Sequence, residues 1–76
     1  MSQIKKASNT AFNLVGQYMD GSWWEQHHLT VDTYEQAKEL ALQGAKHDER
    51  IMSATVEEID LDTFDVVGSV QVFRRE

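Results

Sequence analysis

The chain has no cysteine among its 76 residues, and this absence excludes two common ways of reinforcing a small fold. Neither a disulfide framework nor a thiolate metal site can form. A chain of this length buries only about 60% of the surface that its unfolded form exposes, so we expect modest stability. Self-association is the remaining common remedy.

Long apolar runs and basic residues are also scarce. No stretch approaches the roughly 20 apolar residues of a membrane-spanning helix, and the first ten residues suggest no secretory signal. We therefore expect a cytoplasmic protein. Seven Lys and Arg stand against 13 Asp and Glu, a net charge of −6. This balance disfavours direct binding to nucleic acid or anionic lipid and favours a protein partner with a basic surface.

The strongest helical signal lies in residues 31–50. Asp32 and Thr33 are both good N-cap residues, and Glu35 or Gln36, three positions later, can complete a capping box. Small and apolar residues then recur at three- and four-residue steps, which predicts one buried helical stripe. Its members are Tyr34, Ala37, Leu40, Ala41, Gly44 and Ala45. Gly44 marks either a close contact with a neighbouring element or the end of the regular helix.

The segment before the helix predicts a β-hairpin with strands at residues 12–19 and 22–30. Asp20 and Gly21 are typical of a two-residue type I′ turn, which would place Tyr18 opposite Trp23. The face toward the helix would then carry Phe12, Leu14, Tyr18, Trp23, Leu29 and Val31. The other face would be open and carry Val15, Met19, Trp24, Gln26 and His28. Trp24, with Val15 and Met19, is either a contact patch or a side chain lying flat on its strand.

Residues 51–73 predict a second hairpin with its loop near residues 62–65. The apolar parity changes between Val56 and Ile59, and a β-bulge at Glu57 and Glu58 would restore it. Both faces of the last strand are apolar, which predicts a central or doubly covered strand. The order ββαββ belongs to the α+β class: a four-stranded, largely antiparallel sheet with one helix on one face. It forms one domain, residues 11–76, after a flexible arm, residues 1–10.

No residue pattern indicates catalysis. His27 and His28 point to opposite faces of a strand and cannot share an ion, and a hydrogen bond between His27 and Glu25 is the simpler expectation. Asp60, Asp62 and Asp65 fail the calcium-loop pattern because glycine is missing at its sixth position. No nucleophile elbow or glycine-rich phosphate loop occurs. We predict no catalytic, cofactor-binding or metal-binding residues, and a protein that is not an enzyme.

Residues 57–65, EEIDLDTFD, are the other candidate binding segment. The segment holds Glu57, Glu58, Asp60, Asp62 and Asp65, with Phe64 near its tip. It is either a solvated hairpin that discourages aggregation or a set of charges that imitates a phosphate backbone. In the second case the carboxylates would steer the chain onto the basic groove of a nucleic-acid-binding protein, and Phe64 would anchor it.

In length, acidity, compact α+β composition and this acidic segment, the chain resembles the small inhibitors that phages and mobile elements use against bacterial defences, including anti-CRISPR proteins. The resemblance implies a stoichiometric blocker of a CRISPR effector or similar nuclease complex. Two functions remain open. One is an inhibitory or regulatory interaction protein that uses the acidic hairpin and the open sheet face. The other is a structural or regulatory homo-oligomer that self-associates through Trp24, Val15 and Met19.

Overall fold

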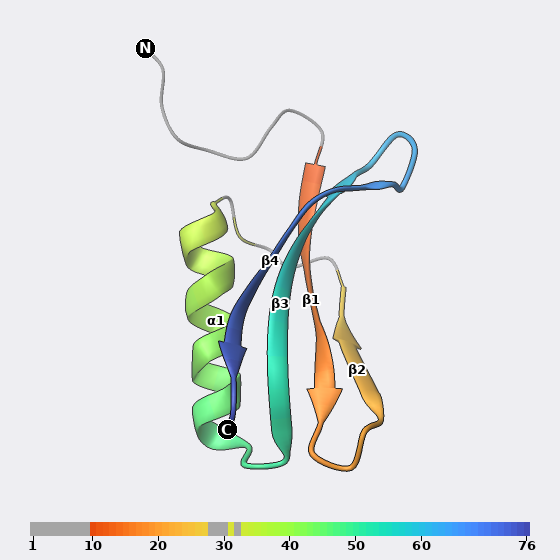
Figure 1. Cartoon of the computed structure of the whole chain (residues 1–76). Coiled ribbons are helices and arrows are strands. Elements are labelled where there is room, and N and C mark those ends of the chain that lie inside the picture. Colours follow the sequence, from red (N-terminus) through yellow and green to blue (C-terminus); the bar gives the residue numbers. More distant parts are fainter. Residues whose placement is uncertain (1–9, 28–30, 32) are drawn as a thin grey trace.

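The computed structural model describes residues 10–27, 31 and 33–76, and its elements follow the predicted ββαββ order (Figure 1). The elements are β1 (Thr10–Tyr18), β2 (Trp23–Gln26), α1 (Tyr34–His47), β3 (Ile51–Asp60) and β4 (Val66–Arg74). The strands form one antiparallel sheet in the order β2-β1-β3-β4. The predicted α+β class and four-stranded sheet are confirmed. The predicted arm, residues 1–10, lies outside the described residues except for Thr10, which begins β1.

Helix α1 begins where the capping signals predict. Thr33 is the N-cap: its hydroxyl accepts a hydrogen bond from the Gln36 amide at 3.2 Å, and the Gln36 side chain accepts one from the Thr33 amide at 3.2 Å. This reciprocal pair satisfies two amide groups that a helix start otherwise leaves without partners. Asp32, the other predicted cap, lies outside the described residues.

The buried face of α1 is narrower than the predicted stripe. Ala37, Ala41 and Ala45 are buried at successive four-residue steps, while Leu40 is 44% exposed. Gly44 is exposed, and a Cβ at its position would meet no atom within 4 Å. The helix also continues past Gly44 to His47. Both predicted roles for Gly44 are therefore wrong. The methyl groups of the three alanines let the helix axis lie close to the sheet.

The core is a thin layer between α1 and the middle of the sheet. Its central cluster contains Phe12, Leu14, Ala37, Ala41, Ala54 and Val56. Trp24, Val31, Tyr34, Val72 and Phe73 pack at its margin. No large side chain is completely buried among the described residues. Since the core is built from small and medium side chains, each one accounts for a large share of the apolar burial.

The first hairpin turns at Asp20 and Gly21, but its register differs from the prediction by one residue. Gln17 lies opposite Trp23, and Gly16 opposite Trp24. The loop has three residues, because the Tyr18 amide bonds to the Ser22 carbonyl at 2.8 Å and the Gly21 amide to the Tyr18 carbonyl at 3.0 Å. Gly21 alone adopts positive φ here, at 91°, as in a type I turn followed by a bulge.

The second hairpin contains irregularities, one of them beside Glu58, but the extra residues are not in β3, where a bulge was predicted. β3 pairs with β1 without interruption from Ser53 to Asp60, so the predicted bulge at Glu57 and Glu58 in β3 is wrong. The extra residues belong to β4, where Val67 and Val72 have no directly opposite residue in β3. These two irregularities switch the parity of β4 and explain why both of its faces carry apolar residues. The prediction that this strand is central or doubly covered is also wrong, since β4 forms an edge and is largely exposed.

The chain end is tied to the fold by Arg75. Its guanidinium donates to the carbonyl oxygens of Ile51 at 2.9 Å and Ala45 at 3.1 Å, and it lies 5.2 Å from the centre of the Phe73 ring. The Ala45 carbonyl is in the last turn of α1, where carbonyl groups lack partners within the helix. Arg75 therefore joins the helix end to β3 and β4.

Candidate partner-binding site

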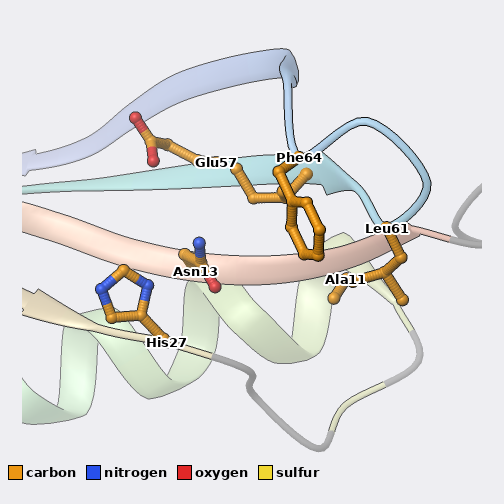
Figure 2. A pocket seen from close by; sticks show the side chains of 7 residues that line it. Ala11, Asn13, His27, Glu57, Leu61 and Phe64 are labelled. Atoms are coloured by element: carbon orange, nitrogen blue, oxygen red, sulfur yellow. The ribbon is translucent and has the colours of Figure 1, made fainter.

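A shallow hollow lies on the open face of the sheet, near the turn between β3 and β4 (Figure 2). It encloses about 340 Å³. Its lining residues come from β1, β3, the turn and the end of the first hairpin: Ala11, Asn13, His27, Glu57, Ile59, Leu61 and Phe64. In Figure 2, Phe64, Leu61 and Ala11 gather at the turn end, and Glu57, Asn13 and His27 lie at the other. An apolar half therefore adjoins a polar, carboxylate-bearing half.

The alternation of side chains along β3 explains why one half of the hollow is apolar. Ile59 lies opposite Ala11 on the face turned away from α1, yet it is only 9% exposed. Leu61 and Phe64 line the hollow beside it. In the sequence, the apolar residues of this strand change from one face to the other between Val56 and Ile59. This change reflects a second small apolar cluster on the open face of the sheet, and no bulge in β3 is required to explain it.

Asp60 organises the turn that carries Phe64. Its Oδ1 accepts hydrogen bonds from the amides of Asp62 at 2.7 Å and Thr63 at 3.3 Å. Its carbonyl oxygen accepts from the Phe64 amide at 2.6 Å, and its amide donates to the Asp65 carbonyl at 2.9 Å. The Asp60 carboxylate is therefore used inside the turn, and its first role is structural.

Phe64 has an unusual backbone conformation for a large side chain. Its φ is 63°, the only positive φ of a non-glycine residue in the described ranges. This left-handed conformation costs roughly 1–2 kcal/mol for a residue with a Cβ. The side chain is 69% exposed, so burial of the ring offsets little of that cost. Strained residues of this kind concentrate at functional sites, where the conformation aims a side chain.

The five carboxylates of residues 57–65 occupy different environments. Glu58 accepts a hydrogen bond from the Thr10 hydroxyl at 2.7 Å and lies on the helix side, opposite Phe12. Glu57 lines the hollow, opposite Asn13. Asp62 and Asp65 are exposed in and beside the turn. Glu57, Asp62 and Asp65 are thus the members of the set that are best placed to meet a partner on the open side.

Charge is distributed unevenly along β3 and β4. The turn that joins β3 to β4, here called the acidic turn, lies at one end of these strands, and the C-terminus lies at the other (Figure 1). The C-terminal end mixes both signs, with Lys46, Arg50, Arg74 and Arg75 beside Asp48, Glu49 and Glu76, whereas residues 57–65 contain no basic residue. The turn end therefore has a negative potential that no nearby basic residue of the same segment neutralises.

The other predicted contact residues do not form one surface. Trp24 lies on the helix side, packs against the core cluster and is half-buried, which corrects its expected place on the open face. Val15 is on the open face, opposite Glu25 and Thr55, and Met19 is in the first turn, 54% exposed. The exposed tryptophan is Trp23, which is 69% exposed and lies on the open face opposite Gln17.

The predicted contact between His27 and Glu25 is present. His27 Nε2 lies 2.6 Å from Glu25 Oε1, and both side chains are more than half exposed. His28 lies outside the described residues. Over residues 10–27, 31 and 33–76, no group of three potential metal ligands is close enough to hold an ion.

The sequence interpretation missed several residues of the hollow. It gave no binding role to Ala11, Asn13, Ile59 and Leu61, and it placed Trp23 on the wrong face. The signal that could have identified the hollow was the shift in apolar parity after Val56, since it places Ile59 beside Ala11 across two strands.

Comparisons with protein-family models, with curated proteins and with solved structures find no match to this chain. In the part of the chain that the structure describes, no helix has the length and apolar character needed to cross a membrane. Function is therefore inferred from the geometry and charge of the chain itself.

Proposed function

We propose that the chain is a small acidic protein-interaction module that acts by binding, without catalysis. Its partner is a protein with a basic, nucleic-acid-binding surface, and its binding surface is the turn end of the open sheet face. The central observation is the exposed, strained Phe64 between Asp62 and Asp65, beside a hollow that contains Glu57. An apolar anchor surrounded by carboxylates complements a basic groove with an apolar recess.

The biological role that fits this surface is inhibition. A groove that holds nucleic acid presents Lys and Arg side chains at the spacing of a phosphate backbone. Carboxylates on a rigid hairpin compete for those side chains, and their negative potential speeds the encounter. A phage or mobile-element inhibitor of a CRISPR effector or similar nuclease complex would act in this way, by stoichiometric occupation of the nucleic-acid path.

The test uses purified RNA-guided nuclease complexes as the probe. Inhibition of target cleavage is measured at increasing ratios of the chain to the complex, and direct binding is measured by biolayer interferometry at several salt concentrations. We expect inhibition to saturate near one chain per effector binding site. The association rate should fall as salt rises, because salt screens the steering charges.

Matched charge variants locate the surface. Asp62→Asn with Asp65→Asn removes two charges from the turn, and Glu39→Gln with Glu49→Gln removes two exposed charges elsewhere. The turn variant should associate about tenfold more slowly and with a weaker salt dependence, while the control stays near wild type. Equal effects of the two variants would show that net charge alone governs binding. Failure of the wild-type chain to bind or inhibit any such complex would refute the proposed partner class.

A further inference from the structure

The outer edge of β4 lacks most of the features that normally protect an exposed edge strand. β4 is nine residues long and is the terminal strand of the sheet, with no partner on its outer side in the described ranges. Residues 66–73 contain no charged side chain and no proline. Exposed edges are normally protected by short length, charge, proline or bulges, and β4 has only its two bulges. The opposite edge, β2, is four residues long and carries Glu25.

The exposure of β4 changes along its length. Val72 and Phe73 pack against the core, whereas residues 66–71 are all exposed. Val66 is 50% exposed, Val67 56% and Val70 49%. The first two thirds of the strand therefore combine unpaired backbone groups with valine side chains that lack cover. Such an edge can accept another strand through main-chain hydrogen bonds, with neighbouring side chains adding apolar contact.

We propose that β4 pairs antiparallel with β4 of a second copy of this chain. The charges at the two ends of β4 favour a second copy of the chain as the partner. Because Asp65 directly precedes β4 and Arg74 is its last residue, antiparallel pairing brings the Asp65 end of each copy beside the Arg74 end of the other. Opposite charges then meet at both ends, while the paired strands between them are uncharged. Pairing through the acidic turns would instead place like charges together.

The geometry of the pairing follows from symmetry. A two-fold axis perpendicular to the sheet makes the contact self-complementary and closes the assembly at two copies. Residues 68–71, which lie between the bulges at Val67 and Val72, supply the regular stretch for its centre. The result is one continuous sheet from two copies, with both helices on the same face. Trp23, on β2 at the far edge, stays exposed.

Molecular mass tests the proposal. Sedimentation equilibrium over a wide concentration range should show a reversible monomer–dimer transition. Asp65→Lys alone and Arg74→Glu alone each place like charges together at both ends, so each should raise the dimer dissociation constant about tenfold at low salt. An equimolar mixture of the two variants restores opposite charges at both ends of a mixed pair. This mixture should regain dimerisation, which a merely destabilised variant would not do.

A second pair of variants separates edge pairing from other apolar contacts. Val70→Lys puts a charge on the edge, and Leu40→Lys does the same at a helix position of similar exposure. Val70→Lys should give a monomer, and Leu40→Lys should leave the dimer intact, with circular dichroism confirming that both are folded. Trp emission should not shift on dimerisation, because Trp23 remains in water. A monomer at every concentration, equal effects of the two lysine variants, or no rescue in the mixture would overturn the proposal, independently of any inhibitory activity.

Discussion

Trp24 lies directly over Gly16, the residue opposite it in the first hairpin. A Cβ on Gly16 would come within 2.8 Å of Cε2 of the Trp24 indole and would overlap the carbonyl oxygen of Ser53 in β3. Gly16 is buried in the sheet interior, between β2 and β3. The absence of a side chain at this position therefore permits both the close approach of β3 and the seating of the indole against the core.

Gly16→Ala should destabilise the fold strongly. The new methyl group meets backbone as well as a ring, and backbone cannot move aside without breaking the pairing of β1 with β3. We expect the free energy of unfolding to fall by at least about 2 kcal/mol, as in other overpacked interiors. Urea denaturation monitored by circular dichroism measures the change.

Gly44→Ala is the matched control for that substitution. A Cβ on Gly44 meets nothing within 4 Å, and the residue is inside α1. Alanine has the higher helix propensity and fewer unfolded conformations to lose, so stability should rise by up to about 1 kcal/mol. If Gly16→Ala left the urea midpoint unchanged or raised it, as Gly44→Ala should, the close packing around Gly16 would be wrong.

The two adjacent tryptophans should report the register of the hairpin. With Trp24→Phe, the remaining Trp23 should emit at long wavelength and be readily quenched by acrylamide, since it is 69% exposed. With Trp23→Phe, the remaining Trp24 should emit at shorter wavelength and be protected, because it packs against the core. The opposite emission pattern would support the two-residue turn and the register that it implies.

The register shows where sequence reasoning reached its limit. Alternation and the Asp20-Gly21 signal correctly located a hairpin, but a two-residue loop and a three-residue loop both place glycine at positive φ. Only the longer loop leaves Asp20 in an ordinary conformation, with its Oδ1 accepting hydrogen bonds from the Ser22 amide at 2.9 Å and hydroxyl at 2.6 Å. One additional loop residue exchanged the faces of Trp23 and Trp24.

Other parts of the fold could be predicted from the sequence because the signals for them are local. The capping box at Thr33 and the alanine spacing are local, so the sequence predicts the start of α1 and the alanine row of its buried face. The hollow at Phe64 depends on how three separate segments meet, and the edge position of β4 depends on strand order. The parity shift after Val56 indicates the Ile59 part of the hollow but not which segments meet there, and the bulges of β4 obscured its alternation.

Acid should weaken two contacts at the opposite end from the acidic turn. The Arg50 side chain, followed by its amide, donates hydrogen bonds to Asp48 and lowers the pKa of that carboxyl below its ordinary value of 3.8. The Ser22 hydroxyl and amide lower the pKa of Asp20 in the same direction. A carboxyl whose pKa is lower in the folded state stabilises the fold above its unfolded pKa. That stabilisation is lost as the pH falls through the folded value.

Arg50→Gln should therefore reduce the acid sensitivity of the fold. The variant loses the pair of bonds from the guanidinium to Asp48, so the Asp48 pKa should move back toward 3.8 in an NMR titration of the side-chain carboxyls. Asp20, held chiefly by Ser22, should keep most of its lowered pKa in the same sample. An unchanged Asp48 titration would show that the backbone amides, not the guanidinium, hold the carboxylate.

Phe64 should affect stability and binding in opposite directions. Asparagine tolerates the left-handed conformation better than phenylalanine, so Phe64→Asn should leave stability unchanged or raise it by up to about 1 kcal/mol. A β-branched residue is least compatible with positive φ, and Phe64→Val should lower stability by about 1 kcal/mol. Thermal and urea unfolding give both values. Under the proposed function, both variants should also weaken association with the basic partner, because each removes the exposed ring. If Phe64→Asn destabilised the chain as much as Phe64→Val, packing of the ring beside Ile59 and Leu61 would outweigh the strain, and its role would be structural.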